Sequence, residues 1–286
     1  MSGNTAQLKG QQRDGDTSPG VAGYVDVHAH LIHDDFAGEE DAVASRARSA
    51  GLDLVIVNGL EPKSNRAVLE LCGRHEHLQP ALGIYPVDAI GTRIDHASWQ
   101  HPFPPPAVFD VDEEIDFIAS VASQLIAIGE CGLDRYWITS EMDEQERVLR
   151  RLCEVALAHD LPVILHSRKA ELRTFEILQD MGVERADFHC FGGKLKLAKR
   201  IADAGYYLSI PPVVVRAESF QRMAAALPLD RILTETDCPY MGPDKGTRNE
   251  PANVPRGVQA IAEARGAEEH VVRHQIRANA RALFGF

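Results

Sequence analysis

The sequence of 286 residues lacks any long hydrophobic run, and no apolar stretch approaches the roughly 20 residues that a membrane-spanning helix needs. Aromatic residues make up only 6% of the chain, whereas the hydrophobic fraction of 44% and the charged fraction of 25% are ordinary for a globular protein. This composition excludes a disordered chain, a collagen-like repeat and a coiled-coil rod. We therefore expect a protein with one sizeable core and no membrane association.

Cysteine is scarce as well, and the five cysteines are scattered without a Cys-x-x-Cys pair. An odd number of dispersed cysteines in a long chain is typical of reduced thiols, so we predict a cytoplasmic protein without a disulfide framework.

Basic residues are also few, since 30 Lys and Arg stand against 42 Asp and Glu and leave a formal net charge of −12. A protein that coats duplex DNA through a basic stripe is disfavoured, but an enzyme that uses bound cations on nucleic acid is not.

The chain begins with 22 residues rich in Gly, Gln, Asp and Ser. This segment has no apolar core of about 7–15 residues, which a signal peptide would need. We predict a flexible N-terminal tail over residues 1–22 and a single barrel domain over residues 23–286.

Short apolar runs alternate with amphipathic stretches along the rest of the chain. The eight runs begin at Tyr24, Leu52, Leu78, Leu125, Leu161, Arg185, Tyr206 and Arg231. Nearly continuous apolar character is typical of strands buried on both faces of a parallel sheet. Eight strand-and-helix units predict an α/β protein with a (β/α)8 TIM barrel, which typically has about 250 residues. An open, doubly wound sheet is the alternative, but the turn after the first strand lacks the Gly-rich phosphate motif of that fold.

Titratable side chains gather where the predicted strands end, which is where the catalytic groups of a barrel lie. They come from five different strands: His28, His30, Glu130, His166, His189 and Asp237. Buried without partners, such groups would be costly. Imidazole and carboxylate at this density suit Zn²⁺, Mn²⁺ or another divalent cation, so the pattern predicts a metal site.

Six ligands exceed the needs of one tetrahedral zinc ion that keeps an open position, so we expect two divalent metal ions, Zn, Mg or Mn. In this hypothesis His28, His30 and Asp237 hold the first ion, and the other two histidines hold the second. Glu130 bridges the two ions, and Asp237 accepts a proton from the attacking water. Glu130 and Asp237 are therefore the predicted catalytic residues.

Six short motifs follow one another along the chain. They are His-Ala-His from His28, Gly-Glu-Cys-Gly-Leu-Asp from Gly129, Pro-Val-Ile-Leu-His-Ser-Arg from Pro162, His-Cys-Phe-Gly-Gly from His189, Glu-Thr-Asp-Cys-Pro-Tyr from Glu235 and Asn-Glu-Pro from Asn249. In this order, from Tyr24 to the C-terminus, the sequence resembles the TatD family of metal-dependent deoxyribonucleases. The resemblance implies an amidohydrolase-type barrel that hydrolyses DNA phosphodiester bonds, often from a 3′ end, with the same six residues as metal ligands.

The sequence departs from that family at three places. Tyr85 precedes Pro86 where family members commonly have His, and Lys169 follows Ser-Arg where Asp is frequent. Arg135-Tyr136-Trp137 stands in place of an aromatic pair. A tyrosine binds metal or phosphate less readily than a histidine, so Tyr85 calls for a substrate preference or a rate that differs from the family's.

Substrate contacts are less sharply indicated. Arg168 serves either as a phosphate clamp or as an ion-pair partner of a loop carboxylate. Lys194 and Lys196 either support phosphate or only begin a solvated helix. Tyr85 and Asn249 are further candidates for substrate binding.

These observations predict a metal-dependent hydrolase, most simply a TatD-type deoxyribonuclease that removes nucleotides from 3′ ends through attack of a metal-bridging hydroxide. The expected partners are DNA ends or single-stranded nucleic acid as substrate, with no membrane and no obligate protein partner. No covalent intermediate is expected, because no Gly-x-Ser-x-Gly elbow is present. An amidohydrolase-type deacylase or lactonase is one alternative, and a catalytically idle interaction subunit is another.

Overall fold

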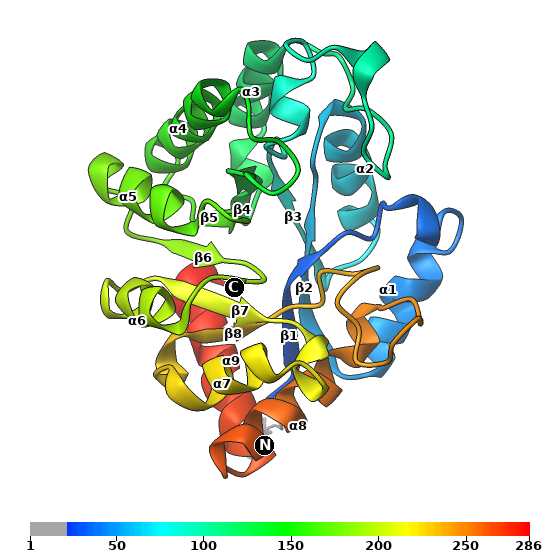
Figure 1. Ribbon diagram of the computed structural model, residues 1–286. Coiled ribbons are helices and arrows are strands. Elements are labelled where there is room, and N and C mark those ends of the chain that lie inside the picture. Colours follow the sequence, from blue (N-terminus) through cyan, green and yellow to red (C-terminus); the bar gives the residue numbers. More distant parts are fainter. Residues whose placement is uncertain (1–21) are drawn as a thin grey trace, which may run out of the picture.

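Eight parallel strands form the centre of the protein in a computed structural model that describes residues 22–286 (Figure 1). The strands pair in sequence order, as β1 (Tyr24–Ala29), β2 (Leu52–Asn58), β3 (Leu78–Leu82), β4 (Ala127–Gly132), β5 (Val163–His166), β6 (Ala186–Phe188), β7 (Tyr207–Ile210) and β8 (Ile232–Thr234). Each lies within one of the eight predicted apolar runs. The predicted tail lies outside the described residues except for Ala22.

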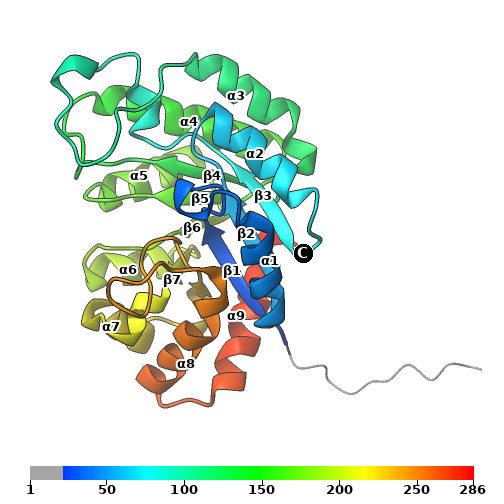
Figure 2. The same cartoon turned by 90° about the vertical axis from the view of Figure 1, so that its right-hand side faces the viewer.

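Helices follow the strands and lie outside them, as both ribbon views show (Figures 1 and 2). They are α1 (Glu40–Ser49), α2 (Pro62–Cys72), α3 (Val111–Ser120), α4 (Met142–Ala158), α5 (Glu171–Met181), α6 (Leu195–Asp203), α7 (Glu218–Ala226), α8 (Val254–Arg265) and α9 (Glu269–Phe284). Each buries one face; α4, for example, buries Val148, Leu149, Leu152 and Ala156 at helical spacing.

The ends of β1 and of the segment after β8 close the barrel through backbone hydrogen bonds. The Asp237 amide donates to the His28 carbonyl at 2.8 Å, and the His30 amide donates to the Cys238 carbonyl at 3.2 Å. Lower down, the Thr234 hydroxyl donates to the Val25 carbonyl at 2.7 Å. The predicted (β/α)8 barrel is thus confirmed, and the sequential strand order rules out the doubly wound alternative.

Several strands end earlier than the apolar runs that predict them. His189 lies one residue beyond β6, and Asp237 lies three residues beyond β8 with a left-handed φ of 51°. Strand alternation therefore does not govern where the Asp237 side chain points. The chain leaves the extended conformation where its polar side chains turn into the mouth of the barrel.

The Pro-rich connection between β3 and α3 packs against the barrel. The Trp99 indole N–H donates to the Phe103 carbonyl at 2.8 Å, and the Phe103 ring meets the Trp137 ring edge to face at 4.9 Å. This contact joins the connection to the segment after β4.

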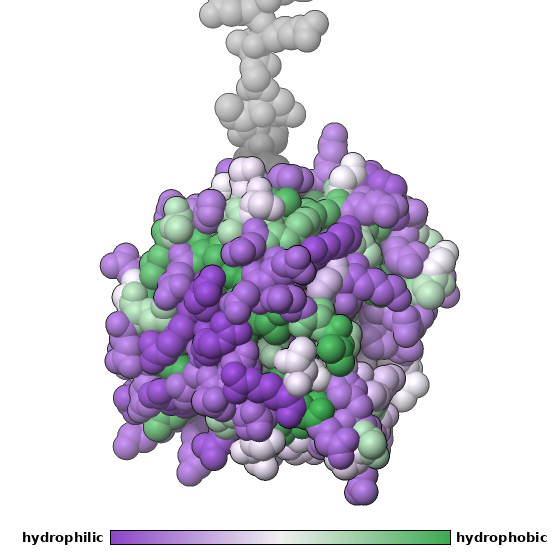
Figure 3. Space-filling model, turned by 90° about the horizontal axis from the view of Figure 1, so that it is seen from above, coloured by the Kyte–Doolittle hydropathy of each residue, from purple (hydrophilic) through white to green (hydrophobic). Residues whose placement is uncertain are grey.

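The surface and the cysteines agree with the composition. On the face shown in Figure 3, hydrophilic side chains cover most of the surface, and hydrophobic ones form small separate patches. All five cysteines are free. Across residues 22–286 no helix has both the length and the apolar character to span a bilayer.

A substitution at Gly132 can test the close approach of β4 and β5. Its φ is +146°, and a Cβ added there would overlap the carbonyl oxygen of His166. We expect Gly132→Ala to lower the free energy of unfolding by about 1–3 kcal/mol, measured by urea denaturation. Gly192→Ala is the control, because a Cβ there would meet nothing within 4 Å. Equal stability of the two variants would contradict the close approach.

Candidate metal centre

Three of the predicted ligands converge from β1 and the segment after β8. His28 lies within β1 and His30 directly after it, and their Nε2 atoms are 3.0 Å apart. The Asp237 Oδ1 atom lies 3.6 Å from the Nε2 of His30 and 3.9 Å from that of His28. These three side chains form one group of donors able to hold a cation.

The other three ligands come from the middle strands. Glu130 lies within β4, His166 is the last residue of β5, and His189 follows β6. The Glu130 Oε1 atom is 3.0 Å from the Nδ1 of His166 and 3.0 Å from the Nε2 of His189. They form a second group of donors able to hold a cation.

Glu130 joins the two groups because its two oxygens face opposite ways. Its Oε2 atom is 3.3 Å from the Nε2 of His28 and 3.3 Å from the Nε2 of His30, while its Oε1 atom faces the second group. Its side chain is almost fully buried. A carboxylate with one oxygen toward each group has the form of a bridge between two ions.

The spacing of these donors fits divalent cations. Ligands placed tetrahedrally about 2.0–2.1 Å from a zinc ion lie about 3.3–3.4 Å from one another. The donor atoms around Glu130 are separated by 3.0–3.3 Å, and the Asp237 Oδ1 atom lies slightly farther, at 3.6–3.9 Å from its two histidines. Nitrogen and carboxylate donors are also the set that zinc and manganese accept.

The charges of the centre depend on one another. Burial alone would lower the pKa of His30, but interactions with Asp237 and Glu130 raise it to about 10. Burial would raise the pKa of Glu130, but the neighbouring histidines hold it well below its usual range. Burial and the nearby His189 lower the pKa of His28 to about 3. The carboxylates therefore stay ionised and attract positive charge to the space between the ligands.

Two of the histidines are oriented by contacts behind them. The His166 Nε2 atom lies 2.8 Å from the Asp134 carboxylate, which also accepts the backbone amides of Tyr136 and Trp137. The His30 Nδ1 atom lies 3.3 Å from the Asn58 carbonyl oxygen. Such partners fix which ring nitrogen faces a metal. Sequence reasoning missed Asp134, although it closes the Gly-Glu-Cys-Gly-Leu-Asp motif.

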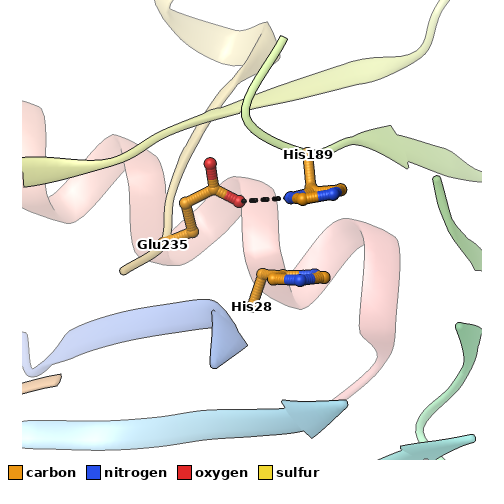
Figure 4. Close-up of side chains that lie close together, drawn as sticks. All are labelled: His28, His189 and Glu235. Atoms are coloured by element: carbon orange, nitrogen blue, oxygen red, sulfur yellow. Dashed lines mark ion pairs between the residues drawn. The ribbon is translucent and has the colours of Figure 1, made fainter. Parts of the chain in front are cut away.

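Glu235 lies beside His189 and forms an ion pair with it (Figure 4). Its Oε2 atom is 3.6 Å from the His189 Nδ1 and accepts the Ser209 hydroxyl at 2.9 Å, while its Oε1 accepts the Cys190 amide at 2.7 Å. The His189 ring stacks on the His28 ring with centroids 3.9 Å apart. His28, His189 and Glu235 form a third possible metal group. Because both Glu235 oxygens are engaged, we interpret it as a support of His189.

Asp26 lies deeper, beneath the ligands. It accepts the Thr236 amide at 2.9 Å, the Thr236 hydroxyl at 2.6 Å and the His28 amide at 3.2 Å. Burial raises its pKa to about 8. These bonds fix the backbone on both sides of the barrel closure, one residue from Asp237.

Arg168 lies at the mouth of the barrel without a carboxylate partner among residues 22–286. Its guanidinium carbon is 3.7 Å from the centroid of the Tyr136 ring and 5.3 Å from that of Trp137. The ion-pair interpretation of Arg168 is therefore not observed. An exposed guanidinium stacked on an aromatic ring stays available to a phosphate.

The two remaining substrate candidates have different surroundings. The Tyr85 ring meets the His166 ring edge to face at 4.9 Å, so it lies beside the centre. The fully buried Asn249 donates to the Thr236 carbonyl at 2.9 Å and to the Tyr240 carbonyl at 2.7 Å, and accepts from Asn253. These contacts make Asn249 a support of the loop that carries Asp237.

Comparison with known proteins agrees with this arrangement. The sequence model of a family described as TatD related DNase matches residues 25–285. The chain belongs to the TatD family. The resemblance that the motifs indicated is thereby confirmed over nearly the whole barrel.

Individual relatives within the TatD family cover the chain equally well. A human protein named deoxyribonuclease TATDN3 is 33% identical and spans 92% of this chain and 94% of its own. A Salmonella typhimurium protein named 3'-5' ssDNA/RNA exonuclease TatD is 30% identical and spans 91% and 98%. The solved structure of YJJV, a TatD homologue from Escherichia coli, has a TM-score of 0.79 at 27% identity, covering 92% and 98%.

The six predicted ligands of this TatD protein lie together, and metal ligation by them remains a prediction. Asp134 offers a test that leaves the ligands in place. We expect Asp134→Asn to weaken Zn²⁺ binding about 10- to 100-fold, because His166 loses the carboxylate that orients it. Competition with a chromophoric chelator measures the affinity. Asp143→Asn, at an exposed position of α4, is the control. Unchanged affinity in Asp134→Asn would contradict the positioning role.

Proposed function

We propose that this protein is a metal-dependent nuclease of the TatD type that removes nucleotides from the 3′ end of a single DNA strand. The observation that carries the proposal is Glu130, whose two oxygens each face two histidines. Such an arrangement suits two divalent cations, Zn, Mg or Mn, and not one. The names of the human and Salmonella relatives, both nucleases, support the substrate class.

The six ligands would divide as the two groups do. His28, His30 and Asp237 would hold one ion, and the two other histidines would hold the second, with Glu130 shared. When bound, the ions would lower the pKa of a water molecule and neutralise charge on the phosphoryl oxygens.

Asp237 is the residue best placed to move a proton. It is the only ligand carboxylate besides Glu130, and interactions with His30 hold its pKa below the usual value although burial would raise it. Both oxygens of Glu130 lie within 3.3 Å of imidazole nitrogens, whereas the Oδ1 atom of Asp237 lies 3.6–3.9 Å from those of His28 and His30. We assign Asp237 the role of accepting the proton of the attacking water.

The contacts at the mouth favour a phosphodiester over an ester or amide of carbon. Arg168 provides two parallel N–H donors that match the oxygens of a phosphate. Tyr136 beside it is 48% exposed and offers a ring on which an unpaired base can stack.

The cysteines bear on the cellular compartment of the protein, and the barrel bears on its domain organisation. Five free cysteines, three of them buried, suit a reducing compartment, so we propose that the protein works in the cytoplasm. We also propose that residues 23–286 act as one domain.

A single-stranded oligonucleotide labelled at its 5′ end tests the activity. We expect a ladder of products shortened from the 3′ end, no cleavage of circular single-stranded DNA, and complete loss of activity with excess EDTA. Cleavage of the circle would contradict the exonuclease polarity. Activity in EDTA would contradict the requirement for metal.

Variants of the two carboxylates test the roles given to them. We expect Glu130→Gln and Asp237→Asn to remain folded and to lower kcat at least about 100-fold, because one loses the bridge and the other the proton acceptor. Circular dichroism checks the fold. Glu70→Gln and Asp180→Asn, at exposed helical positions, are the matched controls. Wild-type rates in either carboxylate variant would remove its proposed role.

A further inference from the structure

A cavity of about 560 Å³ lies between the starts of α5 and α6. These two helices are neighbours in both ribbon views (Figures 1 and 2). Two acidic and six basic side chains line the cavity. The basic ones are Arg135, Lys169, Arg173, Lys194, Lys196 and Arg200. In a chain with a net charge of −12, this is a local excess of positive charge.

Most of these cations have no carboxylate partner. Of the six, only Arg173 forms ion pairs among residues 22–286, with Glu146 at 2.6 Å and Glu176 at 3.8 Å. Of the two acids of the lining, Glu176 faces Arg173, and Glu171 accepts the backbone amide of Lys169 at 3.2 Å and forms no ion pair with the lining cations. Five of the six cations therefore form no ion pair within residues 22–286, and the lining keeps a clear excess of positive charge.

The backbone around the cavity adds to this potential. The residues that precede α5 and α6 are Ala170 and Lys194, and neither side chain caps its helix. The first amide groups of both helices are thus free of a side-chain acceptor, and helix N-termini favour anions. The positive φ of 61° at Lys169 bends the chain just before α5.

Short chain segments link the cavity lining to the metal centre. Lys169 follows the ligand His166 by three residues, so the two Cα atoms are at most about 10–11 Å apart. The backbone amide of Arg135 donates to the carbonyl of Arg168 at 2.9 Å, which joins the exposed guanidinium at the mouth to the cavity lining. A strand whose 3′ end lies at the centre can therefore reach the cavity with the nucleotides on its 5′ side.

We propose that this cavity binds the backbone phosphates of a single nucleic-acid strand whose end lies at the metal centre. The cations come from three successive parts of the barrel, namely the segment after β4, the start of α5 with the residue before it, and α6 with the residue before it. Cations supplied by three parts of the chain can contact several phosphates of one strand. The inference rests on the proposed nuclease function and names how its substrate is held.

Lysine variants of the full-length, metal-loaded protein test the proposal. One variant carries Lys169→Ala, Lys194→Ala and Lys196→Ala together. The matched control carries Lys63→Ala, Lys199→Ala and Lys245→Ala, which removes the same charge from lysines outside the cavity lining. Fluorescence anisotropy with a short phosphorothioate oligothymidylate, which resists cleavage, measures binding without relying on turnover.

We expect the cavity variant to bind the oligonucleotide about 10- to 100-fold more weakly than wild type at about 0.1 M salt. The slope of log Kd against log salt should become shallower by up to about 2, because each lysine accounts for about 0.7. The control should bind like wild type. Hydrolysis of bis(p-nitrophenyl) phosphate, which has one phosphodiester and no strand, should be unchanged in both.

Other outcomes separate the two proposals. Equal binding by the cavity variant and the control, or no binding by wild type, would overturn the cavity as a strand site. Loss of bis(p-nitrophenyl) phosphate hydrolysis in the cavity variant would overturn it too, since the lysines would then serve the metal centre. Binding that depends on the lysines, in a protein that hydrolyses no phosphodiester, would leave the cavity standing and refute the nuclease function.

Discussion

The carboxylate of Glu130 is the constraint on which the rest of the centre depends. It is buried among four imidazoles, so its negative charge must be balanced, and each oxygen has two nitrogens within 3.3 Å. β4 can bring it so close to β5 because Gly129 and Gly132 have no side chains to meet Ile164 and the His166 carbonyl. The chemistry of the mouth therefore begins with a steric requirement inside the sheet.

Much of this arrangement is readable in the sequence because parallel barrels obey simple rules. Strands buried on both faces appear as apolar runs, and the ends of such strands meet at one mouth, which is why the six converging side chains could be named without a structure. The roles of Asp134 and Glu235 could not be predicted, because they depend on contacts with His166 and His189, respectively, that no sequence spacing encodes. The position of Asp237 depends on a left-handed turn beyond β8, which strand periodicity cannot predict.

The polar side chains around the centre are of two kinds. Asn249 and Asp26 are polar and buried, yet they bond to the protein itself and hold the loop of Asp237 and the end of β1. Arg168 and the cavity lysines are the opposite case, since they are exposed and lack partners within the described chain. Residue type alone did not separate these two kinds of polar group; the hydrogen-bond partners did.

Donors drawn from β1, β4, β5, β6 and the β8 loop have a mechanical consequence for the whole barrel. A cation held by them would cross-link strands around the barrel that otherwise pair only with their immediate neighbours. Ligand binding restricted to the folded state adds about 2.7 kcal/mol when the free ion is at about 100 times its Kd. Metal supply would then govern not only turnover but also how long the barrel resists thermal opening and proteolysis.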